Sequence, residues 1–260
     1  MPSTPEARSL AVFCDFENIA LGVREAKYAQ FDMDKVLERL LLKGSIVVKK
    51  AYCDWERYKE FKTAMHAASF EMIEIPHLRQ SGKNSADIRM VVDALDLCYT
   101  KAHVDTFVVI SGDSDFSPLV SKLRENAKTV IGVGVKNSSS DLLINNCDEF
   151  IYYDDLVRQD EQKRRAAKKR REAAPAGEDK KQEAFDVVLE TLNALIAERG
   201  AEEKIWGSMV KQALKRRKPG FNESYYGFRA FSDLLEEMQQ KGLVKLDPDE
   251  KSGGYLIRPA

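Results

Sequence analysis

The stretch Ser111-Gly112-Asp113-Ser114-Asp115-Phe116 follows an apolar, β-rich run, Thr106-Phe107-Val108-Val109-Ile110, and precedes a helical pattern. A short apolar run of this kind predicts a buried strand of a parallel sheet. Asp113 and Asp115 therefore lie at the carboxyl end of that strand, which is the edge where open α/β sheets bind ligands. This edge is the first candidate functional site of the chain.

A second predicted strand delivers polar groups to the same kind of position. Leu10-Ala11-Val12-Phe13-Cys14 continues directly into Asp15-Phe16-Glu17-Asn18. Acidic side chains that converge on one rim repel one another unless a cation lies between them. The usual solution is a divalent metal held by oxygen ligands, and such a metal usually serves phosphoryl chemistry.

Asp87 is a further candidate because it opens a helix after a loop of turn-favouring residues. Taken alone, it is better explained as a complement to the helix dipole. The three carboxylates at the strand ends reverse that weighting and favour a shared site. Asp93 lies six residues later, about 600° around a helix, so it does not share a face with Asp87 and is at most an orienting group.

Strand and helix signals alternate over the first 156 residues. Asp32 can cap a helix that Gly44 ends, and Pro76 ends a later strand. Repeated β-α alternation with right-handed crossovers gives a parallel sheet covered by helices on both faces. The sequence thus predicts a Rossmann-like α/β domain with strands at 10–14, 45–52, 70–75, 106–110, 130–135 and 150–153, and helices at 33–43, 56–69, 86–102 and 118–126.

Composition limits the class of protein. At 260 residues, 43% of them hydrophobic, the chain is long enough for one full domain and a smaller one. No apolar run approaches the ~20 residues that span a bilayer, and the first residues lack the basic and apolar regions of a signal peptide. We therefore expect a cytoplasmic protein without a membrane segment.

Charge is distributed unevenly along the chain. Residues 157–182 hold 10 basic and 5 acidic side chains, whereas residues 1–156 hold 19 basic and 24 acidic ones. This basic segment contains almost nothing that could fill a core, so it is interpreted as a linker that is helical at its start and broken at Pro175 and Gly177. Basic runs attract polyanions, although a solvated tether with no binding role explains the segment equally well.

The motifs of the first 156 residues resemble a known family. The strand followed by Asp15-x-x-Asn18, the helix start Lys83-Asn84-Ser85-Ala86-Asp87-x5-Asp93, and Ser111–Phe116 followed by Leu119 are similar to the NYN domain, a LabA-like branch of the PIN-like nucleases. The resemblance covers residues 8–156. It implies a ribonuclease that uses Mg²⁺ or Mn²⁺, with Asn18 beside the four metal ligands and catalytic carboxylates, Asp15, Asp87, Asp113 and Asp115.

A second resemblance covers residues 183–260. An apolar stripe from Phe185 to Ile196 predicts one helix, and two more helices and a short hairpin follow it, which together make a winged helix. The run Leu-Lys-Arg-Arg-x-Pro-x-Phe at 214–221 and the run Tyr-Gly-Phe-x-x-Phe-x-x-Leu-Leu at 226–235 resemble the OST-HTH/LOTUS domain. This resemblance implies RNA binding and, in some members, a protein partner.

Basic residues of this segment are candidate contacts to the RNA backbone, since phosphate contacts supply position rather than sequence preference. Its aromatic residues Trp206, Phe221, Tyr226, Phe228 and Phe231 are assigned to the core in preference to base stacking. With one lysine from the loop before Asp87, the RNA-binding candidates are Lys83, Lys211, Lys215, Arg216, Arg217 and Lys218.

Two rival interpretations stay open. A Toprim-like arrangement would use Glu17 with Asp113 and Asp115 for metal-assisted cleavage of nucleic acid, and would leave Asp15 and Asp87 without a role. A non-catalytic adaptor would bind RNA and recruit a transcript or a protein through its C-terminal segment. The complete set of four carboxylates argues against such a degenerate nuclease, because an inactive domain has no chemical need for them.

Overall fold

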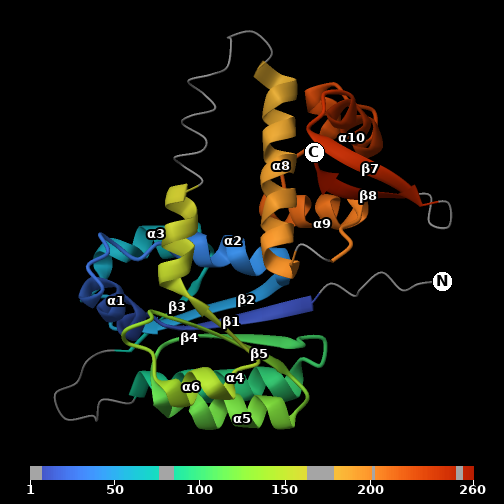
Figure 1. Cartoon of the computed structure of the whole chain (residues 1–260). Helices are drawn as coiled ribbons and strands as arrows, with labels where there is room; N and C mark the ends of the chain where they lie inside the picture. Colours follow the sequence, from blue (N-terminus) through green and yellow to red (C-terminus); the bar gives the residue numbers. More distant parts are fainter. Residues whose placement is uncertain (1–7, 76–84, 163–178, 201–202, 250–253) are drawn as a thin grey trace. The chain divides into compact units, whose positions relative to one another are not determined.

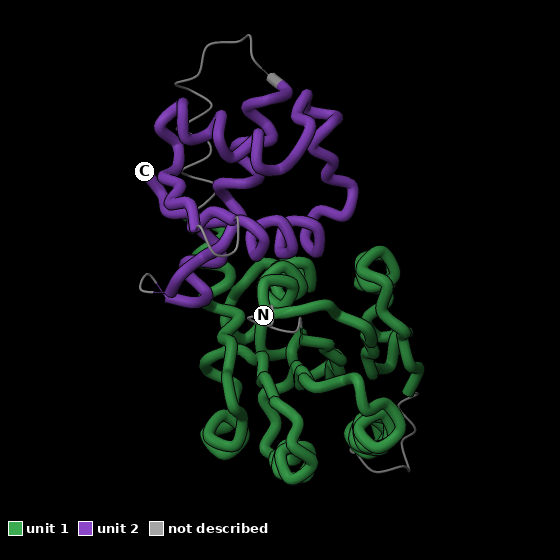
Figure 2. Tube along the Cα trace, turned by 90° about the vertical axis from the view of Figure 1, so that its right-hand side faces the viewer, with its two compact units in different colours: residues 1–167 green, residues 168–260 purple. Residues whose placement is uncertain are grey.

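The computed structural model describes residues 8–75, 85–162, 179–200, 203–249 and 254–260 (Figure 1). The chain separates into two units, Met1–Ala167 and Lys168–Ala260 (Figure 2). The boundary between them falls within the segment interpreted above as a basic linker. Residues 163–178, which hold most of the basic charge of that linker, and Lys83 lie outside the described residues.

The described residues of unit 1 form one six-stranded sheet in which every neighbouring pair of strands is parallel. The strand order is β3-β2-β1-β4-β5-β6. The predicted α/β fold with a parallel sheet is therefore confirmed. The strands are β1 (Arg8–Asp15), β2 (Gly44–Cys53), β3 (Glu71–Glu74), β4 (Thr106–Ile110), β5 (Thr129–Gly134) and β6 (Glu149–Tyr152).

Helices cover both faces of this sheet (Figure 1). Because successive side chains of a strand point to opposite faces, Val12 and Cys14 lie in one buried core, and Ala11 and Phe13 lie in the other. None of the helices in the described ranges is long and apolar enough to cross a membrane. One face carries α1 (Phe16–Glu25), α2 (Met33–Lys43) and α3 (Lys62–Ala67), and the other carries α4 (Ser85–Thr100), α5 (Ser117–Glu125) and α6 (Asp141–Asn146).

Two helices of unit 1 were not predicted, α1 and α6, and a third is shorter than expected. In place of a helix over 56–69 the chain forms a 3-10 turn, η1 (Lys59–Phe61), and the six-residue α3. Trp55 explains the difference: it is 1% exposed, and its Nε1 donates to the carbonyl of Ile73 at 3.1 Å. Fixing this indole in the core draws residues 54–58 into turns and delays the helix.

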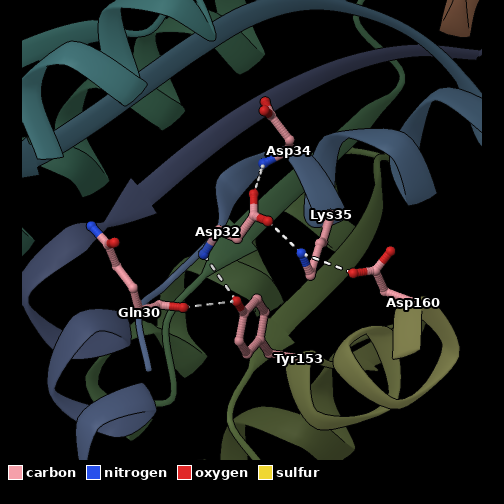
Figure 3. A network of polar contacts seen from close by, with 6 residues as sticks. All are labelled: Gln30, Asp32, Asp34, Lys35, Tyr153 and Asp160. Carbon is pink, nitrogen blue, oxygen red and sulfur yellow. Dashed lines mark hydrogen bonds and ion pairs between the residues drawn. The ribbon is translucent and has the colours of Figure 1, made fainter. Parts of the chain in front are cut away.

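Residues 153–162 are helical, so the chain continues as a helix into the predicted linker. Polar contacts tie this helix to the start of α2 (Figure 3). The hydroxyl of Tyr153 accepts from the backbone N–H of Asp32 at 2.9 Å, and Lys35 pairs with both Asp32 and Asp160. The last helix of unit 1 is thereby fixed to the same layer as α1 and α2.

The described residues of unit 2 form three helices and a small antiparallel sheet. Its buried core includes Phe185, Leu192, Leu214, Leu234 and Ile257, and the side chains of Phe228 and Phe231 are also buried, whereas Trp206, Phe221 and Tyr226 are half-buried. The elements are α8 (Asp179–Arg199), α9 (Gly207–Arg217), the 3-10 turn η3 (Glu223–Tyr226), α10 (Phe231–Gln240), β7 (Val244–Asp249) and β8 (Gly254–Pro259).

Candidate active site

The direction in which the sheet is built reverses between β1 and β4. From β1 the sheet grows through β2 to β3, whereas β4 begins the half that continues through β5 to β6. Ligands bind at such a switch point, outside the carboxyl ends of the strands. Cys14 of β1 pairs with Ile110 of β4, so the residues that follow them, Asp15 at the end of β1 and Ser111 just after β4, lie side by side at this edge of the sheet.

Asp15 is the buried member of the site, at 8% exposure. Its carboxylate caps α1 by accepting the backbone N–H of Asn18 at 3.3 Å, and it accepts the hydroxyl of Ser111 at 3.0 Å. Burial, together with the negative charges of Asp87 and Asp113, outweighs these hydrogen bonds and raises the pKa of Asp15 to about 7. The ionised form of a carboxyl group in this environment is stabilised only when a cation lies nearby, and otherwise the group tends to keep its proton.

Asn18 positions the loop that carries the next two carboxylates. Its side-chain oxygen accepts the backbone N–H of Gly112 at 2.9 Å. Gly112 itself has no room for a side chain, because a Cβ at this position would lie 2.4 Å from the carbonyl oxygen of Ser138. The loop after β4 is therefore held between α1 and residues 138–140, where Ser140 donates its N–H to the Gly112 carbonyl at 2.9 Å.

Asp113 and Asp115 lie on this loop. Asp113 caps the 3-10 turn η2 (Ser114–Phe116) by accepting the N–H of Asp115 at 3.0 Å, and its own N–H donates to the hydroxyl of Ser111 at 3.2 Å. Asp113 is half-buried and Asp115 is exposed. Ser111 thus links the carboxylate of Asp15 to the backbone of Asp113, which joins the ends of both strands in one hydrogen-bonded unit.

Asp87 reaches the same region from the first turn of α4 and is half-buried. Burial raises its pKa to about 6, and the charges of Asp113, Asp115 and Glu17 add to the effect. Mutual repulsion therefore connects all four predicted carboxylates, although they come from three separate parts of the chain. Glu17, in the first turn of α1, is a fifth negative charge at this rim.

The donor set fits a hard divalent cation in charge and chemistry, because carboxylate oxygens are the ligands that Mg²⁺ and Mn²⁺ prefer. The raised pKa values of Asp15 and Asp87 indicate negative charge that a cation would neutralise. The positions of these side chains fit a metal site less well than their chemistry does. Within the described ranges, no group of three or more His, Cys, Asp or Glu side chains is positioned to hold a metal ion.

Three residues that lie at or beside the acidic cluster, Ser111, Glu17 and Arg57, were not named from the sequence as members of the predicted site. Ser111 stands inside the quoted motif, where its hydroxyl could have been recognised as a partner for the carboxylates. Glu17 also lies in a quoted motif and was considered only in the Toprim-like alternative. Arg57 pairs with Glu17 at 3.4 Å and is half exposed, and no local pattern predicts this contact because it depends on the tertiary fold.

Asp93 has a structural role away from the acidic cluster. It accepts the hydroxyl of Tyr52 at 2.8 Å and pairs with Lys50 and Arg89, which outweigh the effect of desolvation and lower its pKa. These contacts hold α4 against β2. The prediction that Asp93 does not share a face with Asp87 agrees with this separate set of partners.

Comparison with known proteins identifies the first unit. The family described as NYN domain matches residues 9–154, which is more than half of the chain. The chain belongs to the NYN domain family. The match supports the PIN-like nuclease interpretation over the Toprim-like one, and residues 155–260 lie outside it.

Two relatives of this NYN protein have no described activity. An uncharacterised protein of Methanocaldococcus jannaschii is 30% identical over 125 residues. The match covers 48% of the present chain and 49% of the relative, so the chain spans about half the length of that relative. A solved structure of a protein of unknown function from Vibrio parahaemolyticus is 26% identical, with a TM-score of 0.53. It matches over 98% of its chain, but over only 59% of the present one.

Outside the NYN match, the basic residues predicted to contact RNA differ in exposure. Lys215 and Lys218 are exposed, Lys211 pairs with Glu223 at 2.9 Å, and Arg216 is half-buried with a pKa lowered by desolvation and by Arg199. Burial argues against one of the candidates. The Arg217 side chain is 4% exposed and binds Glu190 and Thr191 of α8, so it ties two helices together and is unsuited to phosphate contact.

Proposed function

We propose that this protein is a metal-dependent ribonuclease whose active site is the acidic cluster at the β1/β4 switch point. The observation that carries the proposal is the buried carboxylate of Asp15, whose pKa is raised to about 7 by burial and by its acidic neighbours. Unpaired negative charge at a buried site is costly unless it binds a cation. NYN domains are a branch of the PIN-like nucleases, and this chain carries their acidic positions in order.

Each residue has a role in the proposed reaction. Asp15, Asp87, Asp113 and Asp115 would hold Mg²⁺ or Mn²⁺, which when bound supplies an activated water and neutralises charge on the phosphodiester. Ser111 and Asn18 orient Asp15 and the loop that carries Asp113. Arg57 is the cation paired with Glu17 beside the cluster, where it can attract an RNA phosphate.

For unit 2 we propose an OST-HTH/LOTUS winged helix that contributes RNA affinity. Helices α8, α9 and α10, followed by the antiparallel strands β7 and β8, suit this assignment. Lys215 and Lys218 are the exposed basic residues near the end of α9 and are the favoured phosphate contacts. Such contacts strengthen binding without selecting a sequence, so substrate choice would depend on unit 1.

The direct test is cleavage of end-labelled RNA by the purified full chain in Mg²⁺, in Mn²⁺ and in EDTA. We expect cleavage with either ion and none in EDTA. Asp113→Asn should lower activity by more than the ~10–100-fold that is typical when a residue hydrogen bonded to a metal ligand is replaced. Asp96→Asn is the matched control, since Asp96 is an exposed carboxylate on the same helix as Asp87.

The rival functions give different results in this test. A non-catalytic adaptor would bind RNA without any metal-dependent cleavage. A Toprim-like enzyme would cleave RNA or DNA, lose activity in Glu17→Gln, and retain it in Asp87→Asn.

A further inference from the structure

A groove adjoins the acidic cluster on the face of the sheet that carries α4, α5 and α6. Its volume is about 700 Å³, within the ~300–1,000 Å³ range of small-molecule sites. It is lined by Asp87, Ile88, Val91, Val92, Ser114, Asp115, Ser117, Pro118, Ser121 and Leu142. Asp87 and Asp115 belong to both the groove and the acidic cluster, so the groove continues the candidate active site.

The groove exposes apolar side chains to an unusual degree. Ile88 is 63% exposed, Val92 is 55% exposed, and Leu142, on α6, is 58% exposed. Ile88 and Val92 are four residues apart and therefore lie on one face of α4. Several large apolar side chains that are exposed around one concave surface indicate a binding site, because a surface that only faces water rarely gathers them.

A buried hydroxyl beside the groove lacks a hydrogen-bond partner within the described part of the protein. Ser117 is 6% exposed, and its Oγ has no hydrogen-bond partner among the described residues. Buried hydroxyl groups nearly always have a partner, because leaving one unsatisfied costs about 1–3 kcal/mol. Ser117 lines the groove together with Ser114 and Ser121, so a polar group of a bound molecule could satisfy it.

The charge of the lining selects the part of an RNA that fits. Among the described residues that line it, the groove carries two carboxylates and no Lys or Arg, so this part of its lining disfavours a phosphate. A nucleobase is the uncharged part of a nucleotide: its face can pack against apolar side chains while its edge forms hydrogen bonds. We propose that this groove holds a nucleobase of the RNA next to the phosphate at the acidic cluster, an inference that rests on the proposed function.

Direct contact can be tested without catalysis. The full chain is mixed in EDTA with a single-stranded RNA that carries 4-thiouridine in place of uridine, irradiated, digested, and analysed by mass spectrometry. We expect cross-links within residues 85–92, 114–121 or 142. Cross-links that occur only outside these residues would overturn the proposal.

A matched pair of substitutions measures the contribution of the groove to cleavage. Val92→Asn places a polar side chain in the groove, whereas Val47→Asn makes the same exchange at a site of similar exposure, 47%, on β2. We expect Val92→Asn to raise KM by about fivefold or more while kcat changes little, since losing the burial of one valine against a base has an effect of this order. Val47→Asn should match the wild type.

An abasic scan identifies the base that the groove holds. For an RNA cleaved at one mapped bond, removing the base that occupies the groove should lower kcat/KM of the wild type by about fivefold or more. Val92→Asn should then lose little further activity on this RNA, because both changes remove the same interaction. Additive losses would contradict the proposal.

The outcomes separate this inference from the proposed function. Groove cross-links without any cleavage would refute the ribonuclease and support the base site. Cleavage that requires the acidic cluster but is unchanged in Val92→Asn would refute the base site alone. A wild-type dimer that Val92→Asn converts to a monomer would assign the groove to a second copy of the chain and overturn the proposal.

Discussion

At the scale of single residues, Asp15 combines burial with proximity to other carboxylates. It is hydrogen bonded to Ser111 and to the start of α1, yet its pKa stays near 7. The folded protein therefore holds a proton on Asp15 to a higher pH than the unfolded chain does, for which the ordinary value is 3.8. Stability without metal must fall as the pH rises from about 4 through about 7.

Replacing Asp15 by Asn removes this loss. In EDTA at pH 8, Asp15→Asn should raise the free energy of unfolding, by at most about 4 kcal/mol for a shift of some three pKa units. The gain should shrink toward pH 4, because Asp15 is then protonated in the folded protein and close to half protonated in the unfolded chain. Denaturant titrations at the two pH values measure the difference, with Asp96→Asn as control. A gain that does not depend on pH would contradict the assigned ionisation.

Arg217 shows how residue type alone can mislead. Sequence placed it among the phosphate contacts, but its guanidinium is buried against Glu190 and Thr191. Arg217→Gln should therefore lower the free energy of unfolding of unit 2 by about 1–3 kcal/mol. Lys218→Gln, at an exposed position, should leave stability unchanged and weaken RNA binding. Thermal melts together with RNA titrations distinguish the two roles, and equal melting temperatures for both variants would refute the packing role.

At the scale of elements, strand ends were more predictable than helix lengths. Apolar runs such as Thr106–Ile110 define buried strands locally, so the edge that carries Asp15 and Asp113 followed from the sequence. The start of α3 did not, because it depends on Trp55 reaching the carbonyl of Ile73. The contact of Arg57 with Glu17 was likewise unpredictable, since the two residues meet only in the folded chain.

The loop after β4 should tolerate no side chain at Gly112. A Cβ there would lie 2.4 Å from the Ser138 carbonyl oxygen, and that backbone cannot move without disturbing residues 138–140. Gly112→Ala should displace Asp113 and lower the proposed cleavage by at least about tenfold, with a loss of stability of ~1–3 kcal/mol. Gly220→Ala is the control, because nothing lies within 4 Å of a Cβ at that position. Equal activity in both variants would show that loop position is unimportant.

At the scale of the whole molecule, the NYN unit is net acidic over residues 1–156, with 19 basic and 24 acidic side chains. If unit 1 cleaves RNA as proposed, it needs additional affinity to hold a polyanion near its acidic site. In that case the basic segment between the units could raise the local concentration of RNA, which adds affinity without new chemistry.

Neutralising this segment should change binding and leave turnover alone. We expect a higher KM at moderate salt, an unchanged rate at saturating RNA, and a flatter salt dependence, by roughly 0.7 in log–log slope for each phosphate that the segment no longer neutralises. Exchanging the four arginines for Lys keeps the charge and should keep the slope, whereas an unchanged slope in the neutral variant would make the segment a spacer. The neutral variant carries Gln at Lys163, Arg164, Arg165, Lys168, Lys169, Arg170 and Arg171.

The central claim is that the acidic cluster at the β1/β4 switch point cleaves RNA with a divalent metal. The most direct measurement is the single-turnover rate of RNA cleavage in Mn²⁺ by Asp15→Asn and by wild type, prepared in parallel and shown to be folded by circular dichroism. We predict a rate for Asp15→Asn that is lower by more than about 100-fold, beyond the range typical of outer-shell partners. Equal rates for the two proteins, with contaminating nuclease excluded by the inactivity of Asp113→Asn prepared in the same way, would contradict the placement of Asp15 in the catalytic site.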